Sequence, residues 1–306
     1  MIDYNINRIL VPVDFSPASI NALDTAIGMA KLHDADILLL NVIETAGLSN
    51  IHEGGFNAEE SAIALTHQAE QKLQSLRHSI IERFMVPCEV IVTTGIVSSA
   101  ITKISATHHA DMIVMGTHGA TGFRDSLIGL NAFNVVKTAA CPVLTIPSHK
   151  KWESFKKILF PLRPIVSALE KYDFIRKIIR MKDTTLHILG LTTDNEKDIV
   201  LVKNLAGQLK EKLMVDEVDT STYFKVGKNM AGEVIKIATL METDLIVITA
   251  AIDSLFKQFF VGPYIQHILN HAQFPVLSIK PCLAPAHEEE MVQHIREPFL
   301  QEMPYK

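Results

Sequence analysis

The sequence predicts an α/β protein of two repeated halves, each with a parallel sheet that carries helices on both faces. Short apolar runs alternate with longer amphipathic stretches along the chain, a pattern typical of parallel strands joined by crossover helices. The opening segment RILVPVD at 8–14 recurs as KILFPLR at 157–163, and the segment CPVLTI at 141–146 recurs as FPVLSI at 274–279. A chain of 306 residues is long enough for two domains, each with its own core.

Each half contains five predicted strands and four predicted helices. Apolar runs such as Met112 to Met115 are typical of buried parallel strands, and amphipathic stretches between them predict helices. In the first half we expect strands at 8–13, 37–43, 88–93, 112–116 and 142–146, and helices at 17–33, 58–85, 96–107 and 130–138. In the second half we expect strands at 157–161, 185–191, 218–224, 244–249 and 275–280, and helices at 165–181, 195–213, 229–241 and 263–270.

A polar connector separates the two predicted cores. It runs from Pro147 to Ser154, and its proline and charged residues are typical of a domain boundary. We therefore expect one domain at 1–147, a second at 155–281 and a C-terminal tail at 282–306. The tail carries the acidic run Glu288 to Glu290, and the sequence leaves open whether it packs back on a domain or serves as a docking segment.

Composition excludes several classes of protein. A net charge of −5 and a pI near 6.2 provide no broad basic surface for a nucleic-acid backbone. The amino terminus lacks a secretion signal, and the longest apolar run, Ile37 to Leu40, is far shorter than a membrane span, so we expect a cytoplasmic protein. Three scattered cysteines, Cys88, Cys141 and Cys282, form neither a disulfide framework nor a metal motif and are expected to be reduced thiols.

The most informative stretch is a glycine corner after the fourth predicted strand. Gly116 follows the apolar run, Gly119 comes three residues later, and Gly129 precedes a helical segment that starts at Leu130. Glycine at a strand end allows positive φ and lets a bulky ligand approach the backbone. Unpaired N–H groups at the start of the next helix, together with the helix dipole, favour an anion. The pattern therefore predicts an anion-binding loop.

These residues resemble the universal stress protein family in its tandem, two-domain form. The resemblance rests on the spacing of Gly116, Gly119 and Gly129, the opening VPVDFS at 11–16 and the close CPVL at 141–144, and it covers roughly residues 5–280. It implies two doubly wound domains, each with five parallel strands in the order 3-2-1-4-5. It also implies an adenine-nucleotide site in members that carry the full glycine motif. In that strand order, the topological switch point lies between strands 1 and 4.

The resemblance assigns nucleotide contacts to residues of the first half. We expect the Asp14 carboxylate to accept hydrogen bonds from ribose hydroxyls and the backbone near Val13 and Val42 to pair with adenine. Asp14 could instead cap the helix that begins near Pro17, or do both. Backbone donors at the helix start add two positions to those that match the family. The candidate ligand-binding residues are Pro12, Val13, Asp14, Val42, Met115, Gly116, His118, Gly119, Gly129, Leu130 and Asn131.

One residue departs from the family pattern in the first half. The last motif glycine is followed in the family by Ser or Thr, whose hydroxyl can bond a phosphate, whereas Leu130 follows Gly129 here. The N–H groups of Leu130 and Asn131 remain as donors. ATP, ADP and AMP therefore all stay open as ligands, with or without Mg²⁺.

The second half has lost most of the motif. The repeat places Arg163 opposite Asp14, Thr249 opposite Gly116, Ile252 opposite Gly119 and Pro263 opposite Leu130. Proline has no N–H to donate, so this half is not expected to bind ATP in the family manner. The apolar segment 255–261 could fill the vacated pocket, pack between domains, or meet an apolar ligand or partner, and Arg163 beside it would suit an anionic head group.

The sequence thus predicts a stress-response regulator that binds an adenine nucleotide in its first domain. No acid, base and nucleophile combination stands out, so catalysis would be at most slow ATP hydrolysis, and His267 with His271 lacks a third metal ligand. The expected partners are the nucleotide and an unknown protein. By resemblance, strands near 143–146 and 276–279 would pair as an intrachain pseudo-dimer, and a homodimer is open. The alternative is a nucleotide-independent interaction or chaperone-like module.

Overall fold

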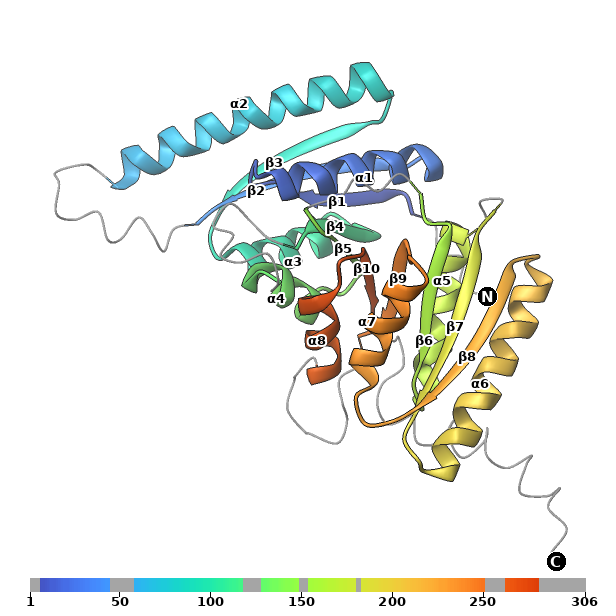
Figure 1. The fold of residues 1–306 in the computed structure, drawn as a ribbon. Helices are drawn as coiled ribbons and strands as arrows, with labels where there is room; N and C mark the ends of the chain where they lie inside the picture. Colours follow the sequence, from blue (N-terminus) through green and yellow to red (C-terminus); the bar gives the residue numbers. More distant parts are fainter. Residues whose placement is uncertain are drawn as a thin grey trace, which may run out of the picture. The chain divides into compact units, whose positions relative to one another are not determined.

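The computed structural model describes residues 6–44, 58–117, 128–148, 154–179, 183–250 and 262–280. The chain divides into two compact units between Ser154 and Phe155, called here the N-terminal and the C-terminal unit. Figure 1 shows their helices and strands. Each unit has five parallel strands and repeats the same topology, which confirms the predicted α/β class.

The N-terminal unit has the strand order β3-β2-β1-β4-β5. Every neighbouring pair in this order is parallel. Helix α1 packs against α2, and α3 packs against α4, so helices cover both faces; α2, the light-blue helix in Figure 1, runs along β3. The elements are β1 (Arg8–Pro12), α1 (Pro17–His33), β2 (Asp36–Ile43), α2 (Ala58–Phe84), β3 (Cys88–Thr94), α3 (Val97–Thr107), β4 (Met112–Gly116), α4 (Leu130–Thr138) and β5 (Val143–Ile146).

The C-terminal unit has the strand order β8-β7-β6-β9-β10, again with parallel pairs throughout. It is the same order as in the N-terminal unit when strands are counted from the start of each unit. The elements are β6 (Lys157–Leu162), the 3₁₀ helix η2 (Val166–Leu169), α5 (Glu170–Ile179), β7 (Thr185–Thr192), α6 (Glu196–Val215), β8 (Asp219–Val226), α7 (Met230–Leu240), β9 (Leu245–Thr249), α8 (Pro263–His271) and β10 (Val276–Ile279).

The core of each unit lies around its central strands. All five residues of β4 and all five of β9 are buried, as expected for parallel strands with helices on both faces. The edge strands are more exposed: only Cys88 of β3 is buried, and β8 has no buried residue. Within the described ranges, every helix falls short of the combination of length and apolarity that a bilayer crossing requires.

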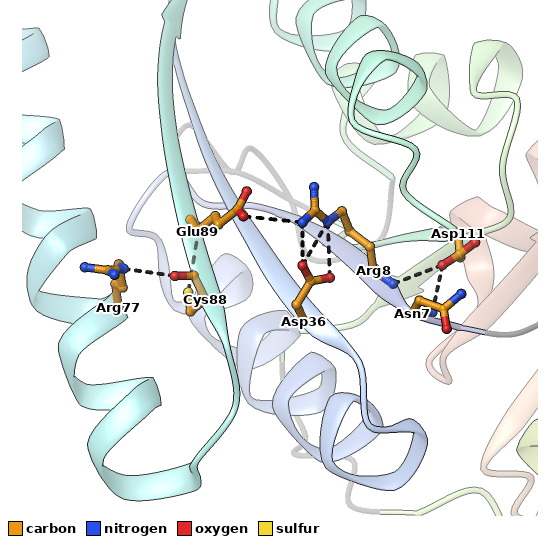
Figure 2. Close-up of polar contacts among 7 residues, drawn as sticks. All are labelled: Asn7, Arg8, Asp36, Arg77, Cys88, Glu89 and Asp111. Atoms are coloured by element: carbon orange, nitrogen blue, oxygen red, sulfur yellow. Dashed lines mark hydrogen bonds and ion pairs between the residues drawn. The ribbon is translucent and has the colours of Figure 1, made fainter.

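A polar cluster fixes the amino-terminal edge of the first sheet (Figure 2). The Asp111 carboxylate accepts the backbone N–H groups of Asn7 and Arg8, at 2.7 and 2.9 Å. The Arg8 guanidinium in turn pairs with Asp36 at 2.5 Å and with Glu89 at 3.4 Å, so it connects β1 with β2 and β3. These contacts hold the strand register at the edge opposite the candidate site.

The second unit repeats the backbone part of this cluster. Asp244 accepts the N–H groups of Lys156 and Lys157, at 3.1 and 3.0 Å, as Asp111 does at the start of β1. Both aspartates directly precede the fourth strand of their unit. The carboxylate therefore supplies the same two hydrogen bonds in each half and joins the fourth strand to the first.

The strand register also defines which residues of the two units are equivalent. Ile9 pairs with Met112 in the first unit, and Ile158 pairs with Leu245 in the second. Gly116 pairs with Ile146 as Thr249 pairs with Ile279. From these pairs, the equivalent positions are Asp14 and Arg163, Ser16 and Ile165, Gly116 and Thr249, Gly129 and Gly262, Leu130 and Pro263, and Asn131 and Tyr264.

One predicted helix is wrong in its first part. The sequence predicts a single α-helix over 165–181, but this segment opens with η2 before α5 begins at Glu170. In the first unit, the equivalent helix has Ser16 as its N-cap, and the Ser16 side chain accepts the Ser19 N–H. Ile165 stands at that position in the second unit and has no side-chain acceptor. The uncapped start is satisfied by tighter 3₁₀ hydrogen bonds instead.

Candidate functional site

The candidate site lies at the carboxyl ends of the central strands of the N-terminal unit. Strand β1 has β2 on one side and β4 on the other, and the chain order reverses between β1 and β4. In doubly wound sheets, ligands occupy the crevice outside this switch point. The segments that follow β1, β2 and β4 all reach this edge, so side chains and backbone groups from three strand ends meet there.

Asp14 lies just after β1 and is exposed. Its Oδ1 accepts the Ser16 N–H at 3.0 Å, while Ser16 itself caps α1. The interpretation of Asp14 as the helix cap is therefore replaced: Ser16 is the N-cap, and Asp14 stabilises the turn before it. Phe15 between them has φ of 64°, a left-handed conformation that costs a non-glycine residue of the order of 1–3 kcal/mol. The turn holds the Asp14 side chain at the sheet edge.

The backbone at the end of β2 offers a donor and an acceptor. The Val13 N–H donates to the Leu40 carbonyl at 2.8 Å, so the even-numbered residues of β2 turn their polar backbone groups toward β1. Val42 comes next on that side, but β1 has ended there. Neither the N–H nor the C=O of Val42 forms a hydrogen bond with a described residue. This pair matches the acceptor and donor along one edge of adenine.

Asn41 lies at the candidate site and was not predicted from the sequence. It is buried, 8% exposed, and its side-chain amide donates to the Val13 carbonyl at 2.7 Å. The Val13 carbonyl is therefore occupied, and Val42 is the better partner for a base. The sequence signal for Asn41 was an asparagine within the apolar run of β2. Buried polar groups require a hydrogen-bond partner, so such a residue indicates a specific contact.

Gly116 has a packing role that the sequence did not predict, and it does not use the positive φ that glycine allows. Its φ is not positive, and an ideal Cβ built on it would lie 2.9 Å from the Ala18 carbonyl carbon and 3.0 Å from the Ala18 Cβ. The glycine thus permits close packing of β4 against α1. A Gly116→Val variant would therefore disturb the fold itself, because the valine side chain would collide with the backbone of α1.

The start of α4 provides backbone donors. Gly129 is the N-cap, its N–H donates to the Thr117 carbonyl at 2.7 Å, and no side chain caps this helix. The N–H groups of Leu130 and Asn131 in the first turn have no partner among the described residues. The Leu130 side chain is 74% exposed, so the residue that replaces the family's Ser or Thr points outward into solvent.

The described part of the chain includes nine of the eleven predicted site residues. Each of them lies at the carboxyl ends of the central strands or at the start of α4. His118 and Gly119 lie outside the described residues, as does the apolar segment 255–261 with Ile252. Val13, Met115 and Gly116 are buried, Pro12, Val42 and Gly129 are half-buried, and Asp14, Leu130 and Asn131 are exposed.

The histidines on α8 contact one another. The rings of His267 and His271 stack with centroids 4.2 Å apart, and His271 Nδ1 lies 2.8 Å from the His267 carbonyl oxygen. Among the described residues, His, Cys, Asp and Glu side chains form no group of three that could hold a metal ion. The stacked pair is therefore explained by contacts within one helix.

The strand order and the switch-point site define the class of doubly wound α/β proteins. The family model described as the universal stress protein family matches residues 5–147. Universal stress protein MJ0531 of Methanocaldococcus jannaschii is 30% identical over 144 residues, 47% of this chain and 84% of that protein. Universal stress protein A homolog 1 of Coxiella burnetii is 32% identical over 146 residues, 45% of this chain and 94% of that protein.

This chain belongs to the universal stress protein family. The crystal structure of a universal stress protein from Archaeoglobus fulgidus covers 90% of this chain and 98% of its own, with a TM-score of 0.73 at 19% identity. That likeness concerns the fold and extends over both units. The two repeated units therefore fit the tandem form of the family.

Proposed function

We propose that this protein is a stress-response regulator that binds an adenine nucleotide at the carboxyl edge of the N-terminal unit. The observation that carries the proposal is the open backbone of Val42 at the end of β2. Its N–H and C=O lie beside the end of β1 with no described partner, and they suit the N1 acceptor and the amino donor of adenine.

Two further features of the site suit the ribose and the phosphates of a nucleotide. The exposed Asp14 carboxylate at the end of β1 can accept hydrogen bonds from ribose hydroxyls. The N–H groups of Leu130 and Asn131, at the positive end of the α4 dipole, can bond phosphate oxygens. These groups are on three segments around one switch point, as a bound nucleotide would require. The nucleotide domain of the proposal is 1–147, and 155–281 is its degenerate partner.

The regulatory mechanism is mass action. A ligand that binds the folded state stabilises it by about 2.7 kcal/mol at a hundredfold excess over Kd. Occupancy of the site would stabilise the strand ends around it and change a surface that another protein recognises. In this proposal, ATP hydrolysis is at most slow and incidental to the signal.

The experiment starts with the nucleotide content of the purified protein. Absorbance at 260 nm and chromatography of the released ligand identify what copurifies. Titration calorimetry with ATP, ADP and AMP, each with and without Mg²⁺, then gives the affinities. Asp14→Ala should weaken all three by about tenfold, since a hydrogen bond to a charged group contributes about 1.5–3 kcal/mol. Asp194→Ala, which removes an exposed carboxylate just after β7, is the matched control.

The Leu130→Ser variant tests the position of the phosphates. Its hydroxyl would restore the phosphate partner that the family places after the last motif glycine. ATP affinity should rise by about tenfold, and AMP affinity should rise less, because its single phosphate lies nearer the ribose. Equal gains for both nucleotides would contradict this arrangement. Absence of any nucleotide binding would favour the nucleotide-independent interaction module instead.

A further inference from the structure

The C-terminal unit reverses the charge at the end of its first strand. Arg163 follows β6 at the position where Asp14 lies in the first unit, and it is half-buried. Its guanidinium carbon lies 4.2 Å from the centroid of the Tyr264 ring. It forms no ion pair with a described acid. Stacking occupies one face of the guanidinium and leaves the N–H groups along its edge for an acceptor.

The start of α8 adds a backbone donor next to Arg163. Gly262 is the N-cap, and the N–H groups of Ile265 and Gln266 both donate to its carbonyl, at 3.0 and 3.3 Å. Pro263 has no N–H. The Tyr264 N–H therefore remains without a partner among the described residues. Tyr264 is also the residue whose ring stacks against Arg163. The α8 dipole also favours negative charge here.

A buried amine lies at the same strand end. Lys171 is 2% exposed, and its Nζ donates to the Pro161 carbonyl at 2.5 Å. In the first unit, the backbone groups of Val13 point toward β2. Pro12, one residue earlier, is the equivalent of Pro161, and its carbonyl therefore points toward β4, on the other side of β1. The Pro161 carbonyl thus faces β9, and the Lys171 amine lies at the switch point of this unit. Burial, followed by the charge of Arg163, lowers the pKa of Lys171 well below its ordinary value.

An unpaired hydroxyl lies on the neighbouring strand. Thr249 ends β9, is 5% exposed, and its Oγ1 has no hydrogen-bond partner among the residues that the structure describes. At the equivalent Gly116, an ideal Cβ points at Ala18 on the helix after β1. By that equivalence, Thr249 points toward Ser167 in η2, four residues beyond Arg163. A buried hydroxyl without a partner costs about 1–3 kcal/mol, which a bound acceptor would offset.

We propose that the carboxyl edge of the C-terminal unit is a second binding site, which takes the oxyanion of a small phosphate or carboxylate ligand. Arg163 binds two oxygens through its planar edge, and the Tyr264 N–H binds one of them. Lys171 supplies a buried amine and Thr249 a buried hydroxyl behind them. The site differs from the N-terminal one because Arg163 attracts an anion but offers no ribose acceptor, and Pro263 removes one helix-start donor.

A titration of the full chain tests this site through the Tyr264 amide resonance. Sodium phosphate and sodium acetate, each at ionic strength matched with sodium chloride, are the two probes. Saturable shifts of the Tyr264 amide are expected with at least one of them, and the tighter probe assigns the ligand's charged group. The readout is independent of nucleotide binding because it monitors α8 only.

Three variants decide the role of Arg163. Arg163→Gln should weaken the tighter probe by about tenfold or more, and Arg163→Lys should give an intermediate loss because it keeps charge without the planar fork. Lys157→Ala removes one exposed charge from the opposite end of β6 and should leave the affinity unchanged. The proposal is overturned if neither probe saturates the Tyr264 shift, or if Arg163→Gln and Lys157→Ala have equal effects.

Discussion

Asp14 and Arg163 occupy the same place in the two units, and their opposite charges give the two strand ends different chemistry. Asp14 brings an acceptor to the end of β1, whereas Arg163 brings donors to the end of β6. The exchange of Gly116 for Thr249 accompanies this reversal. At these positions, the sequence repeat was sufficient to predict which residues are equivalent, but not that Arg163 stacks on Tyr264, because that contact depends on the placement of α8.

Gly116→Ala is expected to destabilise the N-terminal unit by about 1–3 kcal/mol, because its Cβ would overlap the backbone of Ala18. Gly28→Ala is the matched control. Gly28 lies inside α1, and a Cβ added there would meet nothing within 4 Å, so the change should stabilise by about 0.5–1 kcal/mol. Urea unfolding of both variants measures the difference. Equal effects would show that close packing at Gly116 is not the reason for the glycine.

The Cys88 thiol is expected to be inert in the folded protein. It is 5% exposed, and burial raises its pKa to about 12. The thiolate is the reactive form, so at pH 8 only about one thiol in ten thousand would be ionised. Iodoacetamide labelling followed by peptide mass spectrometry should modify Cys88 over a hundredfold more slowly in native than in urea-unfolded protein. Similar rates in both states would show that Cys88 is accessible.

At the scale of elements, periodicity predicted most strands and helices to within one or two residues. Helix α1 at Pro17–His33 and strand β4 at Met112–Gly116 have the predicted bounds. The prediction was wrong at the start of the 165–181 helix, because the loss of a capping side chain at Ile165 has no effect on apolar periodicity. The Asp111 and Asp244 hydrogen bonds also escaped prediction, since each joins segments about ninety or more residues apart.

Asp111→Ala should lower the free energy of unfolding of the N-terminal unit by about 1–2 kcal/mol, because the N–H groups of Asn7 and Arg8 lose their acceptor. Asp111→Asn keeps one acceptor oxygen and should lose less. Glu82→Ala removes an exposed carboxylate that pairs with His78 on the same helix, and should change stability by less than about 0.5 kcal/mol. Denaturant unfolding compares the three; a loss no larger than that of Glu82→Ala would assign Asp111 no role in strand register.

At the scale of the whole molecule, one architecture has been used twice with different lining residues. Both units keep the strand order, the glycine before the last helix and the aspartate before the fourth strand. The differences that bear on the two proposed sites lie at the strand ends. Sequence could predict the shared architecture because apolar patterning repeats in both halves. The backbone donors and acceptors of the proposed N-terminal site, such as those of Val42, were expected only through the family resemblance, because a backbone group leaves no mark on residue type.

Hydrogen exchange should distinguish the two units when ATP is added. Val42 has an N–H that lacks a described partner, and adenine would accept from it, so its exchange should slow strongly on binding. A hundredfold excess of ATP over Kd stabilises the bound state by about 2.7 kcal/mol, which corresponds to about a hundredfold slower exchange through local opening. The equivalent edge of the C-terminal unit, around Arg163 and Tyr264, should change far less, because it offers no ribose acceptor and Pro263 removes one helix-start donor. Slower amide exchange at Tyr264 without slower exchange at Val42 would place the nucleotide in the C-terminal unit. That result would contradict the assignment of the nucleotide site to the N-terminal unit.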